Sequence, residues 1–169
     1  ERAAWLLTSD ICDAICHRKQ LSLNDITWTE TSDGNPTFSL VDHPAPAEDA
    51  LTPPEGFADD SSLVWAMGAT VFYLVMGCHV FSGMGGKRQS QQSPLPYMRK
   101  SMPELSRMVM SMLQYDPKMR PSLAEIKRMS DKQIRALDNR RDSIARPLRQ
   151  RRNHTDASAG KEFWPEDFE

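Results

Sequence analysis

Residues 63–76 read LVWAMGATVFYLVM and contain no charged side chain. The segment is apolar nearly all round, which is typical of an element buried inside a domain, and it is too short to span a membrane. Ser61 or Ser62 can cap the start of a helix here and Gly77 can end it, so the sequence predicts a buried central helix. The residues at 70–73 favour β-structure and leave a buried strand as the alternative.

Patterns on both sides of this segment predict further helices. Apolar residues recur at helical spacing over residues 3–16 and again over residues 103–114. Ser122 and Glu125 have the spacing of a capping box, which predicts that another helix begins there. Residues 82–96 are rich in Gly, Ser and Gln, and we expect them to form a mobile polar loop.

Between the first helix and the central helix the pattern changes. Residues 21–28 alternate loosely, Ser-Asp-Gly-Asn-Pro at 32–36 is a strong turn cluster, and residues 38–41 form a second short apolar run. A β-hairpin over residues 25–41 is therefore expected. Residues 43–56 contain four prolines and predict an irregular loop. The fold class that follows is mainly α with a small β-hairpin.

The net charge of −2 conceals an asymmetry along the chain. Residues 1–126 carry 10 basic and 15 acidic groups, residues 127–152 carry 10 basic and 3 acidic groups, and residues 153–169 carry 1 basic and 5 acidic groups. The low total argues against a uniformly basic nucleic-acid binder. Three cysteines argue against a disulfide-stapled scaffold.

Three regions follow from these patterns: a domain at residues 1–129, a basic helical extension at 130–152 and a disordered tail at 153–169. The narrow apolar stripe of the extension predicts a helix that ends at Pro147. The chain has neither an apolar run long enough to cross a bilayer nor a signal-like pattern. We therefore expect a soluble protein and assign it to no compartment.

Three motifs follow one another along the chain: Pro53-Pro54-Glu55, then Trp65-Ala66-Met67-Gly68, then Asp116-Pro117-Lys118-Met119-Arg120-Pro121. Together they resemble the C-terminal lobe of eukaryotic-type protein kinases, and the resemblance covers residues 3–129. It implies a kinase-like C-lobe followed by a basic C-terminal tail, with the N-lobe missing. It also implies a structural ion pair between Glu55 and Arg120, because a buried carboxylate suits a guanidinium fork. Trp65 and Gly68 take structural positions on the central helix.

The family's catalytic loop can be aligned in two registers. One places Lys19 at the position of the catalytic base and Asn24 at the metal-binding asparagine. The other, which we prefer, places Gln20 at the base and Asp25 at the asparagine. Neither Lys nor Gln can accept a substrate proton as an aspartate would. Both registers therefore imply that the catalytic base is missing.

The family's magnesium motif aligns with Asp42, where His43 and Pro44 replace its Phe and Gly. Asp42 is thus the candidate for metal and cofactor binding, with Asn24 or Asp25. Mg-ATP would be the cofactor only if the family activity survives in a longer chain. The glycine cluster at residues 83–86 follows the central helix and does not predict a phosphate-binding loop.

Three hypotheses about function follow. The first is a catalytically inactive, pseudokinase-like domain that acts by binding a protein partner. The second is a fragment of an active Ser/Thr-type kinase with ATP-dependent phosphotransfer. The third is binding to nucleic acid or to an anionic membrane surface through residues 127–152, where Arg140-Arg141 and Arg151-Arg152 form pairs of cations.

Overall fold

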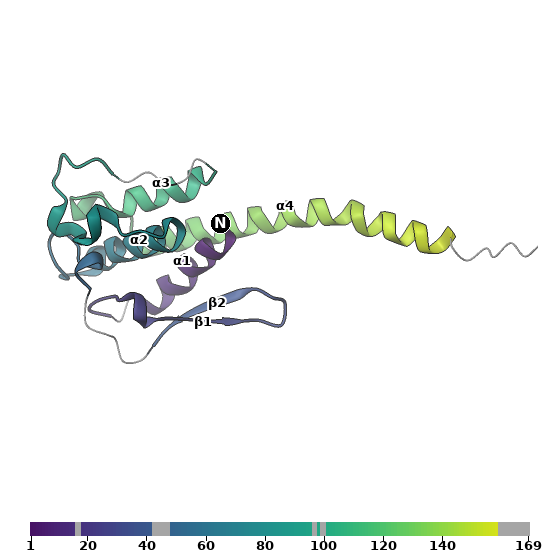
Figure 1. Ribbon diagram of the computed structural model, residues 1–169, viewed down its shortest axis with the longest axis horizontal. Coiled ribbons are helices and arrows are strands. Elements are labelled where there is room, and N and C mark those ends of the chain that lie inside the picture. Colours follow the sequence, from purple (N-terminus) through teal and green to yellow (C-terminus); the bar gives the residue numbers. More distant parts are fainter. Residues whose placement is uncertain (16–17, 42–47, 96–97, 99–100, 159–169) are drawn as a thin grey trace, which may run out of the picture. The chain divides into compact units, whose positions relative to one another are not determined.

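The computed structural model describes residues 1–15, 18–41, 48–95, 98 and 101–158, with the backbone alone over 144–158. The protein is mainly helical and carries one small two-stranded antiparallel sheet (Figure 1). The chain divides into two compact units, Glu1–Ile134 and Arg135–Glu169. The first unit contains α1 (Arg2–Ile15), α2 (Asp60–Met76), α3 (Pro103–Met112) and the first part of α4 (Leu123–Ser158).

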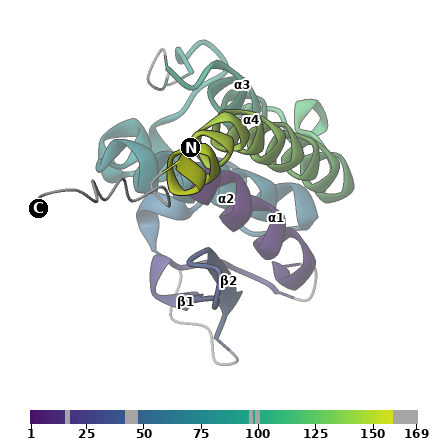
Figure 2. The same cartoon turned by 90° about the vertical axis from the view of Figure 1, so that its right-hand side faces the viewer.

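Helix α2 is the buried centre of the first unit and packs against both α1 and α3. Eleven of its 17 residues are buried, in an unbroken run from Ser62 to Phe72, which confirms the predicted helix and excludes a strand. Figures 1 and 2 show the hairpin and α3 on opposite sides of α1 and α2. A Cβ atom on Gly68 would lie 2.9 Å from the Cβ of Met112, so the glycine allows α3 to approach α2 this closely.

The start of α2 corrects the expected cap. Asp59, rather than Ser61 or Ser62, is the N-cap residue, and its carboxylate accepts hydrogen bonds from the amides of Ser61 at 3.0 Å and Ser62 at 3.2 Å. A carboxylate at this position satisfies two free amides and also interacts favourably with the positive end of the helix dipole. The helix ends as predicted at Gly77, which adopts a left-handed conformation with φ of 72°.

The predicted hairpin is present, with a shorter first strand and a second strand that begins two residues earlier than expected. Strand β1 (Ile26–Glu30) pairs antiparallel with β2 (Pro36–Leu40), and Trp28 lies opposite Phe38. Strand β1 begins late because the preceding residues form a short 3-10 turn, Leu23–Asp25. The other side of β2 contacts α1, where the Phe38 amide donates to the Asp10 carboxylate at 2.9 Å.

Helix α4 begins at the predicted capping box and ends after Pro147, where its end was predicted. The amide of Ser122 donates to the Glu125 carboxylate at 2.9 Å, and the Glu125 amide donates back to the Ser122 hydroxyl at 3.3 Å. Hydrogen bonding to the Ser122 amide lowers the pKa of Glu125. The helix runs past Pro147 to Ser158, so residues 153–158 are helical rather than disordered. A proline lacks the amide donor and usually kinks or breaks a helix, yet the backbone is helical on both sides of Pro147.

Two expectations concern parts of the chain outside the described residues, namely the structure of residues 159–169 and the surroundings of Asp42. In the part of the chain that the structure describes, no helix combines the length and the apolar character needed to cross a bilayer.

Candidate functional site

The predicted ion pair between Glu55 and Arg120 is confirmed. Nη1 of Arg120 lies 2.5 Å from Oε1 of Glu55, and Nη2 lies 2.9 Å from Oε2, so the guanidinium donates to both carboxylate oxygens. The Arg120 side chain is completely buried, and the Glu55 side chain retains 25% of its exposure. This is the parallel two-bond geometry in which arginine holds a carboxylate most strongly.

Arg120 also donates to three backbone carbonyl groups. Nη1 reaches the Ser61 oxygen at 2.9 Å, Nε reaches Gln114 at 2.8 Å, and Nη2 reaches Tyr115 at 3.1 Å. Together with the two bonds to Glu55, these account for all five N–H groups of the guanidinium. One buried side chain thus ties the loop before α2 and the first turn of α2 to the loop that follows α3.

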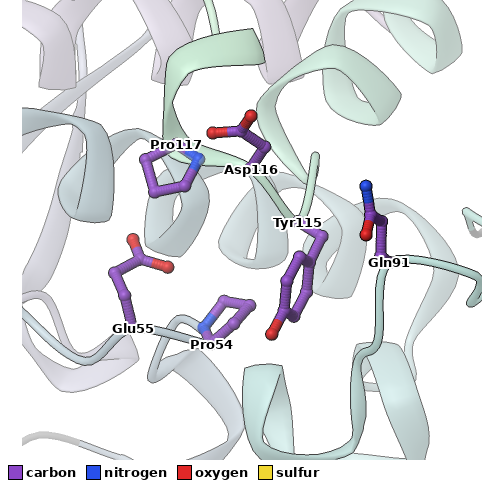
Figure 3. Close-up of a pocket in the computed structure, with 6 residues that line it drawn as sticks. All are labelled: Pro54, Glu55, Gln91, Tyr115, Asp116 and Pro117. Carbon is purple, nitrogen blue, oxygen red and sulfur yellow. The ribbon is translucent and has the colours of Figure 1, made fainter.

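A pocket of about 330 Å³ opens beside this ion pair. It is lined by Pro54, Glu55, Gln91, Tyr115, Asp116 and Pro117. Figure 3 shows the side chains from the loop before α2 facing those from the segment between α3 and α4.

The lining of this pocket suits binding rather than covalent chemistry. Tyr115, 41% exposed, and the two proline rings offer flat apolar faces, while the carboxylates and the Gln91 amide offer hydrogen-bonding groups. The six lining residues include no serine, cysteine, histidine or lysine, so they do not form the usual nucleophile–base pair of covalent catalysis.

The glycine cluster after α2 holds the wall of this pocket in place. The Gly86 amide donates to the Thr52 carbonyl at 2.7 Å. A Cβ atom on Gly85 would lie 2.3 Å from the Asp49 carbonyl oxygen. Because only glycine fits at such distances, these residues serve close backbone packing. The structure therefore gives the cluster a packing role, which the sequence left unassigned.

A buried polar bridge joins α2 to the end of α3. Nε1 of Trp65 donates to Oε1 of Gln89 at 2.9 Å, and Nε2 of Gln89 donates to the Leu113 carbonyl at 2.6 Å. Trp65 also stacks on Phe81 with ring centroids 6.2 Å apart. Gln89 falls within the segment expected to be a mobile polar loop, yet it is buried. No pattern in the sequence distinguishes Gln89 from the neighbouring glutamines.

The residues that the resemblance aligns with the catalytic loop differ in burial. Lys19 and Asn24 are exposed, and Gln20 is half-buried. Asp25 is completely buried, and its Oδ2 accepts the Ser22 amide at 3.0 Å as part of a capping box. This carboxylate is therefore engaged in stabilising its own turn.

The same turn is braced from the proline-rich loop. Oε1 of Glu48 accepts the Ser22 hydroxyl at 2.6 Å and the Leu23 amide at 3.0 Å. Nearby, Nη2 of Arg18 donates to the Val41 carbonyl, while its Nη1 is buried and has no hydrogen-bond partner among the described residues. Among the described residues, no group of three His, Cys, Asp or Glu side chains could hold a metal ion.

An apolar hollow of about 340 Å³ lies on the side of the first unit where α1, β2 and the end of α2 meet. Its lining is largely aliphatic or aromatic: Glu1, Ala3, Ala4, Leu7, Phe38, Leu74, Val75 and Met102. Leu74 is 53% exposed although it belongs to the most buried helix. Exposed apolar surface marks a contact with another protein when it forms part of a larger contiguous patch.

The comparisons with known proteins leave the family open. No protein-family model matches the chain, and a search of curated proteins finds no match to it.

Proposed function

We propose that residues 3–129 form a kinase-like C-terminal lobe that binds a protein partner and does not transfer phosphate. The observation that carries the proposal is the ion pair between Glu55 and Arg120. The two residues belong to separate motifs and are 65 positions apart, yet they meet in a bidentate contact. The burial of α2 between α1 and α3, with Gly68 at the contact with α3, supports the same interpretation.

The absence of phosphotransfer is supported by the residues at the catalytic-loop positions. A lysine or a glutamine cannot take up the proton of a substrate hydroxyl at neutral pH as a carboxylate does. Asp25, which could serve as a metal ligand, has its carboxylate bound to the Ser22 amide. Binding of magnesium there would compete with the hydrogen bond that holds the turn.

The apolar hollow supports the part of the proposal that concerns a protein partner. It combines an exposed aliphatic side chain, Leu74, with the ring of Phe38 and the side chain of Met102. Burial of apolar surface contributes roughly 25 cal/mol per Å² on transfer from water. Association also has an entropic cost, so the hollow would act as one part of a larger interface.

The first test measures nucleotide binding and phosphotransfer by the full chain. We expect no shift of the melting temperature with Mg-ATP and no transfer of the γ-phosphate to the chain or to a general protein substrate. Phosphotransfer that disappears in the Asp42→Asn variant would overturn the proposal in favour of an active kinase.

The second test addresses the partner surface. Leu74→Glu should reduce the capture of a partner because it places a charge in the apolar hollow. Met119→Glu is the matched control, since Met119 is 68% exposed but lies outside the hollow. Equal capture by the wild-type chain and both variants would argue against the hollow as the binding surface. Circular dichroism establishes that both variants are folded.

A further inference from the structure

The structure divides the basic segment of the sequence, residues 127–152, into two parts. At its start, Lys127 lies 2.8 Å from the Asp13 carboxylate of α1, and this hydrogen bond raises the pKa of Lys127. Asp131, one turn later, accepts the Ser9 hydroxyl at 2.6 Å. The first turns of α4 are thus bound to α1 and contribute to the packing of the first unit.

The second unit begins at Arg135, and from there to residue 152 all of the positive charge is carried by arginine. Residues 135–152, which we call the arginine arm, contain seven arginines, two aspartates and no lysine, a net charge of +5. The arm is helical throughout, because α4 extends to Ser158. Arg135, Arg140 and Arg141 are exposed. At 1.5 Å per residue, the arm is about 26 Å long.

We propose that the arginine arm binds the phosphate backbone of nucleic acid without regard to base sequence. A guanidinium fork matches the oxygens of a phosphate, and arginine is the residue that proteins use most often for this contact. Duplex DNA carries roughly one charge per 1.7 Å, so the length of the arm spans more phosphates than it has cations. The inference does not rest on the kinase-like function proposed above.

The composition of the arm favours nucleic acid over a membrane. A helix that lies in a membrane interface needs a broad apolar face that includes residues such as Trp, Phe and Leu. The arm has only three large apolar residues, Leu137, Ile144 and Leu148, and no aromatic residue. The arm also has no aromatic side chain to stack on bases. The contact proposed here is therefore made to the phosphate backbone, which carries no sequence information.

The test measures binding of the full chain to a fluorescent duplex of mixed sequence over a range of salt concentrations. Release of counterions from about five phosphates predicts a slope of roughly −4.5 in a plot of log K against log salt. The variant Arg140→Gln/Arg141→Gln/Arg151→Gln/Arg152→Gln should reduce this slope by about 3 to 4, because each lost phosphate contact removes about 0.9. Glutamine preserves helix propensity at these positions.

A matched control removes the same charge from the first unit. Lys87→Gln/Arg88→Gln/Arg107→Gln/Lys118→Gln changes four exposed cations and should leave the slope as it is in the wild-type chain. An equal effect of both quadruple variants would overturn the proposal, because total charge rather than the arm would then control binding.

The last comparison measures binding of the chain to vesicles of phosphatidylcholine and phosphatidylserine, which represent a membrane surface. Tighter binding to the vesicles than to the duplex at the same salt concentration would overturn the proposal in favour of a membrane surface.

Discussion

A Cβ atom on Gly86 would lie 2.1 Å from the backbone nitrogen of Pro54, closer than Cβ atoms come to other atoms in proteins. The Gly86 amide meanwhile donates to the Thr52 carbonyl at 2.7 Å. The segment after α2 therefore lies directly on the proline-rich loop that precedes α2. The absence of a side chain at residue 86 makes this contact between the two backbones sterically allowed.

The first prediction concerns this contact. Gly86→Ala should lower the free energy of unfolding by about 2–4 kcal/mol, because the new methyl group meets backbone atoms that cannot rotate away. Urea unfolding at equilibrium measures the change. Gly56→Ala is the control: Gly56 has φ of 78° and no neighbouring atom within 4 Å of an added Cβ, so only conformational strain of about 1–2 kcal/mol is expected. A Gly86 variant no less stable than this control would contradict the packing explanation.

The second prediction concerns the buried guanidinium. Arg120→Lys should cost about 2–4 kcal/mol of stability, since a lysine cannot hold both oxygens of Glu55 and leaves backbone carbonyls without donors. The pair Arg107–Glu104 supplies the comparison, because its side chains are 69% and 45% exposed. Arg107→Lys should change stability by less than about 0.5 kcal/mol. Thermal and urea unfolding together distinguish the two, and equal losses would show that Arg120 acts as an ordinary surface charge.

The third prediction concerns the bridge through Gln89. Gln89→Leu leaves the Trp65 N–H and the Leu113 carbonyl buried without partners, which should lower stability by about 2–3 kcal/mol. The tryptophan emission spectrum of the chain should change as well, because Trp65 is one of its four tryptophans. Gln92→Leu, at an exposed position of the same segment, is the control and should be nearly neutral. A spectrum and stability that match the wild-type chain would mean that Trp65 does not depend on this bridge.

The fourth prediction concerns acid. The Ser61 hydroxyl, assisted by the Ser62 and Ser61 amides, lowers the pKa of Asp59. Because the folded pKa lies below the unfolded one, the stabilisation is present above the unfolded pKa of about 3.9 and is lost as the pH falls through the folded pKa. Asp59→Asn keeps an oxygen for the cap but removes the titration, so the gap in stability between wild type and variant should shrink on acidification.

Two further variants check the source of that effect. Asp59→Ala removes the cap itself and should cost about 1 kcal/mol near neutral pH. Asp33→Asn, at an exposed position of the hairpin turn, removes one carboxylate outside the cap and serves as the control for the change in net charge. A gap between wild type and Asp59→Asn that does not vary with pH would remove the titration of Asp59 as its cause.

Much of the fold could be predicted because its signals are local. The continuous apolar run of residues 63–76 requires burial whatever surrounds it. The capping box at Ser122 and the glycine at Gly77 act through their own neighbours, and so does the turn of the hairpin. The pairing of Glu55 with Arg120 is a long-range contact, and the resemblance of two motifs to one family pattern predicted it.

The features that could not be predicted depend on distant neighbours. Gly86 is needed because its backbone lies against Pro54. Gln89 is buried because it bonds to Trp65 and Leu113. Neither relationship produces a pattern in the sequence. Four adjacent residues, 59–62, are of types that can cap a helix, and propensity alone does not rank Asp59 clearly above the others. The C-terminal end of α4 could not be predicted because the sequence does not show whether the helix continues through Pro147.

The separation of Glu55 and Arg120 along the chain also has a kinetic consequence. Their contact closes a loop of 65 residues, whereas α2 and α3 each form through local hydrogen bonds. Since closing a long loop costs entropy, such a contact is expected to form after the transition state for folding. Loss of the pair should therefore accelerate unfolding and leave the folding rate nearly unchanged. We therefore expect the buried guanidinium to affect mainly the rate of unfolding, which unfolding kinetics of an Arg120 variant would measure.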